Sequence, residues 1–301
     1  MNVAVSVAVI GTGLMGGPMA RNLARAGHRV TVFDNAPDNA RAVGEGSVVA
    51  ASAAGAVSGA GAVIVMVPNG PITEAVLFGE GGAAAAMAPG ALLILMSSIG
   101  VGEAKDFAGR ARAMGLRCVD APVSGGTVAA KAGTLSIMAG GPEAEVNAAR
   151  PLFDAMGTTV HVGPNGAGAL AKLVNQLLVA STIAAVSEAL MLAEAGGADP
   201  DKVREALMGG FAASRILELH GARMIAGDFE PGGPAKYQIK DTRAALDVAG
   251  ALGLDMPVLA LADRLFADLI AHGGADLDHS ALILELKRRN GLPAAGLAGQ
   301  T

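Results

Sequence analysis

Lys172 and Asn175 are the residues of this chain whose types and spacing most directly suggest chemistry. They lie three residues apart in an apolar segment, so a helix would present both side chains on one face. An amine in apolar surroundings near other cations has its pKa lowered toward neutrality, which suits a general acid or base. The alternatives are a lysine whose stem covers apolar surface and an ordinary surface amide, and the pattern leaves both open.

A second group of polar atoms follows an expected strand, in the run Asp120-Ala-Pro-Val-Ser124-Gly125-Gly126-Thr127. The Ser124 hydroxyl and the N–H groups of Gly125 and Gly126 are suited to receive the carboxylate of a small substrate. A polar turn between strands would have the same composition, so the residues alone leave this alternative open as well.

A third group consists of Gly11, Gly13 and Gly16, which directly follow an apolar strand and open a helix. In such a strand–turn–helix unit, the glycines allow the tight turn, the approach of a pyrophosphate and close helix packing. The helix N-terminus adds free N–H groups and a partial positive charge. Because this context surrounds the glycines, they predict a dinucleotide site rather than an ordinary glycine-rich turn.

Asp34 indicates which dinucleotide binds. It ends the next expected strand, about twenty residues beyond the glycines, where a carboxylate accepts hydrogen bonds from the ribose hydroxyls. This favours NAD as the cofactor. NADP stays possible, because Arg29, Asn35 and Arg41 are close enough in sequence to meet a 2′-phosphate.

The elements that must position these residues alternate in the first half of the chain. Apolar strands are expected at 5–10, 29–33, 47–50, 62–67, 91–96 and 116–119, with helices at 14–26, 37–43, 53–58 and 101–114. Alternation of this kind predicts an α/β fold with a Rossmann-like, doubly wound parallel sheet. Ligands of such sheets bind at the carboxyl ends of the strands.

From about residue 165 onward the pattern is helical throughout. Helices are expected at 168–195, 200–209, 214–226, 240–252, 257–271 and 280–290, followed by a frayed tail. The sequence therefore predicts two domains. These are a dinucleotide-binding domain at 1–165 and an all-helical substrate and oligomerisation domain at 166–301, joined by a long helix that starts near 168.

Composition excludes several classes of protein. Of 301 residues, 52% are apolar and 16% charged, and the net charge of −5 comes with no basic stripe, so nucleic acid is not expected as a partner. The single cysteine, Cys118, favours a reducing cytoplasm. Neither a signal peptide nor a membrane span is expected, and the apolar segment 174–192 is interpreted as a helix buried in protein. The five histidines lack metal-ligand spacing, so no metal is expected.

Four segments together resemble the β-hydroxyacid dehydrogenase family, of the 3-hydroxyisobutyrate dehydrogenase and 2-hydroxy-3-oxopropionate (tartronate semialdehyde) reductase type. They occur in the family's order and are Ile10-Gly-Thr-Gly-Leu-Met-Gly-Gly-Pro-Met-Ala-Arg-Asn-Leu23, Asp120-Ala-Pro-Val-Ser-Gly-Gly126, Gly168-Ala-Leu-Ala-Lys-Leu-Val-Asn175 and Ile239-Lys-Asp241. The resemblance implies hydride transfer between a nicotinamide cofactor and a small 3-hydroxy acid or its aldehyde acid.

The resemblance also implies a role for each matching position. Lys172 would give a proton to the substrate carbonyl oxygen, Asn175 would position the substrate, and the Ser124–Gly126 loop would hold its carboxylate. Lys240, at the far wall of a cleft between the domains, would touch substrate and cofactor. Our own hypothesis, separate from the resemblance, is that its like charge lowers the pKa of the Lys172 amine. The cofactor would be lined by Gly11, Gly13, Leu14, Met15, Gly16, Asp34, Val67, Pro68, Ser98 and Lys240.

Two departures from the family pattern concern the pocket. Ser98 stands where threonine is common and keeps the hydroxyl. Gly233 stands where an aromatic side chain is usual, and Tyr237 replaces a leucine, so the pocket is expected to be reshaped. The alternative functions are an imine reductase, which commonly lacks this lysine, and a non-catalytic dinucleotide sensor. A homodimer or homotetramer is expected from the helical half.

Overall fold

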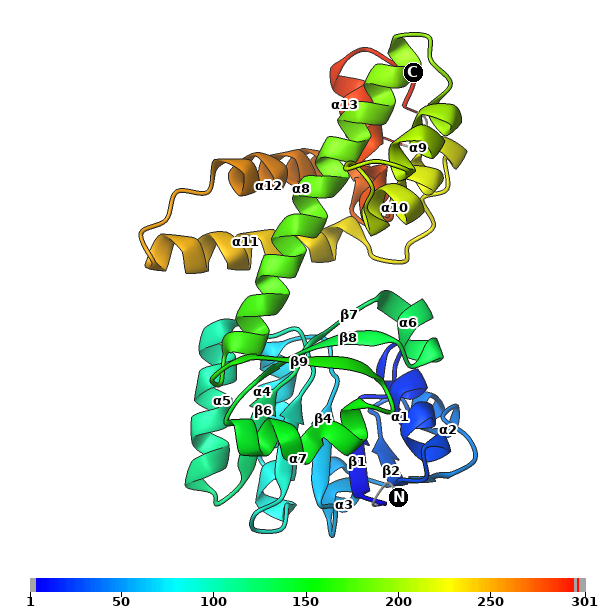
Figure 1. The fold of residues 1–301 in the computed structure, drawn as a ribbon. Coiled ribbons are helices and arrows are strands. Elements are labelled where there is room, and N and C mark those ends of the chain that lie inside the picture. Colours follow the sequence, from blue (N-terminus) through cyan, green and yellow to red (C-terminus); the bar gives the residue numbers. More distant parts are fainter. Residues whose placement is uncertain (1–3, 295–296, 298–301) are drawn as a thin grey trace. The chain divides into compact units, whose positions relative to one another are not determined.

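The computed structural model describes residues 4–294 and 297, and the chain divides into two compact units, 1–172 and 173–301 (Figure 1). The first unit carries all the named strands and the second is built of helices. The predicted class, an α/β Rossmann-like unit followed by a helical one, is confirmed.

The sheet of the first unit begins with six parallel strands in the spatial order β3-β2-β1-β4-β5-β6. This is the strand order of dinucleotide-binding folds, in which the order reverses next to β1. The strands are β1 (Ser6–Ile10), β2 (Arg29–Phe33), β3 (Ser47–Val49), β4 (Ala62–Val65), β5 (Leu92–Leu95) and β6 (Arg117–Asp120).

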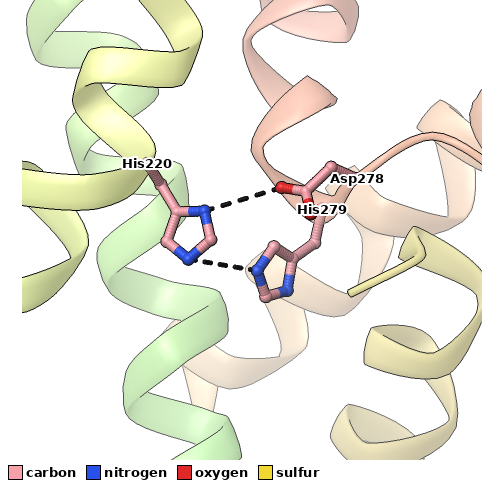
Figure 2. Close-up of side chains that lie close together, drawn as sticks. All are labelled: His220, Asp278 and His279. Carbon is pink, nitrogen blue, oxygen red and sulfur yellow. Dashed lines mark hydrogen bonds and ion pairs between the residues drawn. The ribbon is translucent and has the colours of Figure 1, made fainter. Parts of the chain in front are cut away.

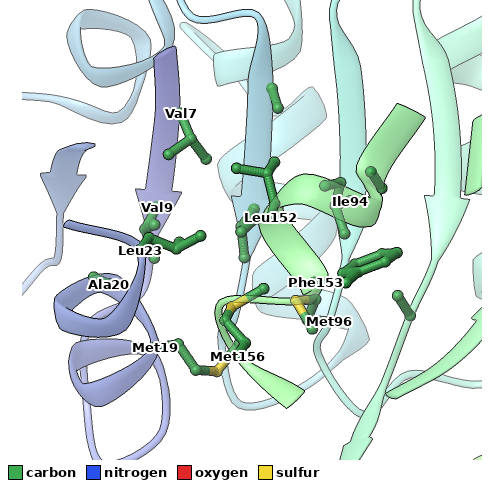
Figure 3. Close-up of a cluster of buried hydrophobic side chains, with 14 of the residues drawn as sticks. Val7, Val9, Met19, Ala20, Leu23, Ile94, Met96, Leu152, Phe153 and Met156 are labelled. Atoms are coloured by element: carbon green, nitrogen blue, oxygen red, sulfur yellow. The ribbon is translucent and has the colours of Figure 1, made fainter. Parts of the chain in front are cut away.

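Both faces of this sheet are buried, which explains why the strands are continuously apolar. Successive side chains of a strand point to opposite faces, so Val7 and Val9 join one core while Ala8 and Ile10 join the other. Leu23, Phe153 and further side chains pack over the first face, as Figure 3 shows. The second face is covered by residues such as Phe107.

The helices that cover these faces connect the strands. They are α1 (Gly16–Arg25), α2 (Pro37–Arg41), α3 (Ala53–Val57), α4 (Gly70–Phe78), the 3-10 turn η1 (Ala83–Ala86), α5 (Val101–Ala113), α6 (Gly126–Ala132) and α7 (Glu143–Phe153). Core residues from α1 and α7 lie on one face of the sheet and those from α3, α4 and α5 on the other. This is the two-sided covering that a doubly wound sheet requires.

Beyond β6 the sheet is no longer purely parallel. The added strands are β7 (Val123–Ser124), β8 (Leu135–Gly140) and β9 (Gly157–Gly163). β8 runs antiparallel to both β6 and β7, and β9 runs parallel to β8. These three strands and helices α4, α6 and α7 were not expected from the sequence. They matter for the site because Ser124 lies in β7 and is therefore held in the sheet.

The second unit contains the remaining helices around its own core. They are the greater part of α8 (Ala167–Ala195), then α9 (Pro200–Met208), α10 (Arg215–Ala226), α11 (Ala235–Ala251), α12 (Pro257–Leu269), η2 (Ile270–Gly274), η3 (His279–Ala281) and α13 (Leu282–Arg289). Side chains of Asp199 and Ser214 cap α9 and α10 by accepting backbone N–H bonds. Ile183, Phe266 and Leu282 are fully buried members of this core.

Two expectations about the helical half hold only in part. The segment 174–192 is buried on one side: Ile183 and Leu190 belong to the core, whereas Val174 and Leu178 are 52% and 60% exposed. The tail is not wholly frayed, since Ala294 and Leu297 are buried against the helical core. Residues 295–296 and 298–301 lie outside the described part of the chain.

Among the described residues, α8 is the one helix long and apolar enough to cross a membrane, judged by length and composition. The core helix of a globular protein has the same length and composition, so this feature alone does not indicate a membrane protein. Of the residues in the most apolar stretch of α8, 28% are buried.

Candidate functional site

The turn between β1 and α1 is built by two glycines that have no room for a side chain. Gly11 has φ +88°, and a Cβ there would lie 2.4 Å from the Met66 carbonyl oxygen. A Cβ at Gly16 would lie 1.9 Å from the Gly11 carbonyl oxygen. Contacts this short are impossible, so Gly11 and Gly16 allow the protein's own backbone segments to pack together.

Gly13 differs from both, because a Cβ there would meet nothing within 4 Å. It therefore borders open space at the start of α1. The first turn of this helix carries no acidic side chain, and its N-cap, Met15, makes no side-chain cap. Leu14, beside Gly13, is 82% exposed. Open space in front of uncapped backbone N–H groups fits the phosphates of a dinucleotide.

Asp34 joins this turn to the end of β2. Its Oδ2 accepts a 2.7 Å hydrogen bond from the Thr12 backbone N–H, and its Oδ1 accepts one from Ala36 N–H at 2.9 Å. The Asp34 carboxylate thus holds Thr12, which lies between Gly11 and Gly13, in place. The Thr12 hydroxyl at 3.4 Å and the Asn39 amide at 3.2 Å also donate to this carboxylate, so ribose hydroxyls would have to replace these two longer bonds.

Val67 and Pro68 follow β4 at the same sheet edge, with Val67 half-buried and Pro68 exposed. The serine that holds them is Ser97, which is buried and whose hydroxyl accepts a 2.9 Å bond from Val67 N–H. Ser98, the residue chosen from the sequence, is half-buried and directly follows Ser97. Sequence reasoning missed Ser97 because the pair Ser97-Ser98 does not indicate which hydroxyl points into the protein.

The Ser124–Gly126 loop and Lys172 come together in the first unit. Ser124 is half-buried and pairs with Ser136 across β7 and β8, while Gly125 and Gly126 are exposed with φ +128° and +64°. The Lys172 ammonium donates a 3.0 Å hydrogen bond to the carbonyl of Val123, the residue before Ser124. The Lys172 ammonium therefore lies beside the residue that directly precedes this loop.

Asn175 lies three residues after Lys172 on α8 and belongs to a network of the second unit. Its amide nitrogen donates to Gln176 Oε1 at 2.9 Å, and Gln176 Nε2 donates to Asp241 Oδ2 at 2.8 Å. Asp241 also lies 3.5 Å from the Lys240 ammonium, which is about half exposed. Gln176 was missed from the sequence, yet it links Asn175 to the Lys240-Asp241 pair.

Two of the five histidines lie together in the fold, although the sequence shows no metal-ligand spacing among them. His220 and His279, far apart in sequence, lie together with Asp278 (Figure 2). Their Nε2 atoms are 3.3 Å apart, and His220 Nδ1 is 3.5 Å from Asp278 Oδ1. The spacing along the chain could not reveal this cluster, because α10 and the turn before α13 meet only in the folded unit.

Asp278 is poorly suited to ligate a metal despite its place in this cluster. Its Oδ2 contacts the N–H groups of Gly232 and Gly233 and the Arg223 guanidinium, each at 3.0 Å. Its Oδ1 accepts bonds from the hydroxyl and the N–H of Ser280. A carboxylate with this many donors offers no lone pair to a cation, and Arg223 would repel one. Burial lowers the pKa of His279 to about 4, which keeps its imidazole neutral at neutral pH.

Of the three positions that depart from the family pattern, Tyr237 and Gly233 have different surroundings. Tyr237 on α11 is 60% exposed, with the Lys236 ammonium 5.6 Å from its ring centroid. A Cβ at Gly233 would lie 3.4 Å from the His279 ring. Whether Tyr237 refills a substrate pocket stays a prediction.

Comparison with known proteins covers both halves of the chain. Residues 6–163 match the family model described as the NAD binding domain of 6-phosphogluconate dehydrogenase. Residues 166–286 match the model described as NAD-binding of NADP-dependent 3-hydroxyisobutyrate dehydrogenase.

Individual proteins are similar over nearly the whole chain. The 2-hydroxy-3-oxopropionate reductase of Escherichia coli (strain K12) is 47% identical, with 92% of this chain and 96% of that protein covered. The 3-hydroxyisobutyrate dehydrogenase of Pseudomonas aeruginosa is 38% identical, with 92% and 95% covered. A solved Mycobacterium tuberculosis 3-hydroxyisobutyrate dehydrogenase with L-serine has a TM-score of 0.86 at 34% identity, with 95% of this chain and 100% of that chain covered.

The glycines allow a test that separates folding from cofactor binding. Gly16→Ala is expected to lower the free energy of unfolding by about 3 kcal/mol, because its Cβ overlaps the Gly11 carbonyl. Gly13→Ala is expected to change it by less than about 0.5 kcal/mol and yet weaken NADH binding about tenfold or more. Urea unfolding and fluorescence titration measure the two effects. Unchanged NADH affinity in Gly13→Ala would contradict a phosphate site at this turn.

Proposed function

The chain belongs to the β-hydroxyacid dehydrogenase family, and from this premise we propose that it moves a hydride between NAD(P) and a small 3-hydroxy acid or the corresponding aldehyde acid. The identity of 47% to a 2-hydroxy-3-oxopropionate reductase favours an aldehyde acid of that type as substrate. One observation carries the catalytic part of the proposal: the Lys172 ammonium is fixed 3.0 Å from the Val123 carbonyl, directly before the Ser124–Gly126 loop.

The residues of the β1–α1 turn are proposed to hold the cofactor. The pyrophosphate would lie against Gly13, Leu14 and Met15, with Gly11 and Gly16 keeping the turn compact. Asp34 would accept hydrogen bonds from the adenosine ribose. Val67, Pro68 and Ser98 would line the path toward the nicotinamide. When bound, the nicotinamide supplies the site that gives or accepts the hydride.

The substrate would bind through its carboxylate and react at the neighbouring carbon. Ser124 offers a hydroxyl, and Gly125 and Gly126 offer backbone N–H groups in a positive-φ conformation. Lys172 would protonate the carbonyl oxygen on reduction and remove the hydroxyl proton on oxidation. Asn175, with its amide oriented by Gln176, would position the substrate, and Lys240 would contribute positive charge near both substrate and cofactor.

The substrate proposal predicts the effect of removing the amine. Lys172→Ala should lower kcat about 10²- to 10⁴-fold, the usual contribution of a general acid or base, with NADH affinity within about threefold of wild type. Lys131→Ala, at an exposed lysine of the same unit, serves as the control and should keep kcat within about twofold. Steady-state kinetics with 2-hydroxy-3-oxopropionate and 3-hydroxyisobutyrate measure this. Near wild-type turnover of Lys172→Ala would refute the assigned role.

The cofactor proposal predicts a shift in preference from one substitution. Asp34→Ser removes the carboxylate that accepts from a ribose and repels a 2′-phosphate, so kcat/KM for NAD should fall about tenfold or more and that for NADP should rise. Asp106→Asn, in the exposed pair with Arg110, is the control and should leave the ratio unchanged. A preserved NAD to NADP ratio in Asp34→Ser would show that the carboxylate does not select the cofactor.

We also propose that the protein assembles as a homodimer or homotetramer. The support is the apolar surface that α8 leaves open within one chain, including Val174 and Leu178 at 52% and 60% exposure. Sedimentation of wild type and Leu178→Arg should give an oligomer for the first and a smaller species for the second. A wild-type monomer at about 10 µM, where an interface of standard size is stable, would refute the assembly.

The proposed location is the cytoplasm. Cys118 is the only cysteine and is buried, and burial raises the pKa of its thiol, so it is held as an unreactive thiol. A chain with this cysteine content is suited to a reducing compartment.

A further inference from the structure

Asp120 is a buried carboxylate to which the proposed function assigns no role. It is the last residue of β6 and is 2% exposed. Its Oδ1 accepts a hydrogen bond from Gly166 N–H at 2.8 Å, and its Oδ2 accepts one from Ala169 N–H at 2.9 Å. Burial raises the pKa of the Asp120 carboxyl, and the two backbone N–H groups oppose that rise.

Gly166 directly precedes α8, the helix that carries Lys172, and Ala169 lies in its first turn. The first N–H groups of a helix have no partner within the helix, and its N-terminus carries a partial positive charge. One carboxylate satisfies two of these groups at once and matches the charge. Asp120 therefore fastens the first turn of α8 to the end of the central strand β6.

Two glycines bring the strand and the helix close enough for these bonds. A Cβ at Gly168 would lie 2.4 Å from the carbonyl oxygens of Asp120 and Met138. A Cβ at Gly140, on β8, would lie 2.6 Å from the Gly168 nitrogen and 2.9 Å from Asp120 Oδ1. The first turn of α8 thus lies directly against the backbone of β6 and β8.

A second contact joins the same two segments farther along. Val123 lies three residues after Asp120, and Lys172 lies three residues after Ala169. The Lys172 ammonium donates to the Val123 carbonyl at 3.0 Å. The segment that contains the substrate loop and the segment that contains the lysine are therefore connected at both ends, first through Asp120 and then through Lys172.

We propose that Asp120 is a positioning residue for Lys172. By fixing Gly166 and Ala169, its carboxylate sets the register of α8 that aims the ammonium at Val123 and the Ser124–Gly126 loop. An aspartate is needed because both oxygens of its short side chain accept. An asparagine at this position would turn an N–H donor toward one of the two backbone donors. This inference rests on the proposed function for the role of Lys172 and adds the group that holds it.

The test begins with a readout that needs no substrate. The variant is Asp120→Asn, which keeps the volume of the side chain. Acetic anhydride acetylates lysines, and mass spectrometry measures the rate at Lys172. The rate at Lys131 in the same sample is the internal reference. Loss of the fixed contact with Val123 should speed acetylation of Lys172 about threefold or more. A second variant, Asp120→Glu, keeps the charge but moves both acceptor oxygens by one methylene. The rate of Lys172 acetylation should rise less in it than in Asp120→Asn.

The control separates positioning from a general loss of stability. Val146→Ala shortens a buried side chain of α7 in the same unit and should lower stability while leaving Lys172 acetylation unchanged. In steady-state kinetics, Asp120→Asn should lower kcat about tenfold or more and change KM less than about threefold. Val146→Ala should leave kcat and KM at their wild-type values.

The outcomes distinguish the two proposals. A wild-type enzyme without turnover on 3-hydroxy acids refutes the proposed function, while the acetylation rates still decide the role of Asp120. Acetylation of Lys172 at the wild-type rate in Asp120→Asn overturns the inference. An equal rise in Val146→Ala overturns it as well, because loss of stability alone would then explain the effect.

Discussion

One physical constraint shapes the carboxyl edge of the parallel sheet. Backbone segments approach one another there so closely that no side chain fits between them, and only glycine is possible. At the β1–α1 turn, Gly11 and Gly16 meet the carbonyls of Met66 and Gly11. At the start of α8, Gly140 and Gly168 provide the same closeness around Asp120. The two helix N-termini that serve the site are therefore both held against strands by glycines, one near the expected cofactor and one near the expected proton donor.

The two termini differ in how their free N–H groups are used. At α1 no side chain caps the helix and Gly13 borders open space, which leaves the N–H groups for a phosphate. At α8 the buried Asp120 carboxylate already accepts bonds from two such N–H groups, so this helix end is anchored within the protein. The first turn of α1 is thus open, as the proposed phosphate site requires, whereas that of α8 is already bonded to a carboxylate of the protein itself.

Much of the fold could be predicted because each strand of the parallel sheet is buried on both sides. Continuous apolar runs such as Val7 to Ile10 are typical of strands in this setting, and the glycine turn and Asp34 follow from local sequence. Strands β7 to β9 were missed because β7 has two residues and β9 exposes most of its side chains. Helix α11 was expected to start at Lys240 and starts at Ala235, because Pro234 occupies its N-cap position and provides the start signal.

Residues whose roles depend on tertiary contacts could not be found from the sequence. Ser97 differs from Ser98 only in the direction it points, and Gln176 becomes informative only when Asp241 lies beside it. The His220–His279 cluster and the Asp120 cap likewise join segments 59 and 46 residues apart. Such pairs leave no periodic or local trace, which is why motif reasoning located Lys172 but not the groups that orient it.

Direct transfer of the hydride is the central claim, and isotope tracing tests it most directly. NADH carrying deuterium at nicotinamide C4 would be incubated with an aldehyde acid of the 2-hydroxy-3-oxopropionate type, and the product analysed by mass spectrometry. We predict that the reduced product gains one deuterium at the former carbonyl carbon when the C4 position of the correct face is labelled, and none when the opposite face is labelled. NADH that binds without being oxidised, or a product free of deuterium with either label, would contradict direct hydride transfer by this protein.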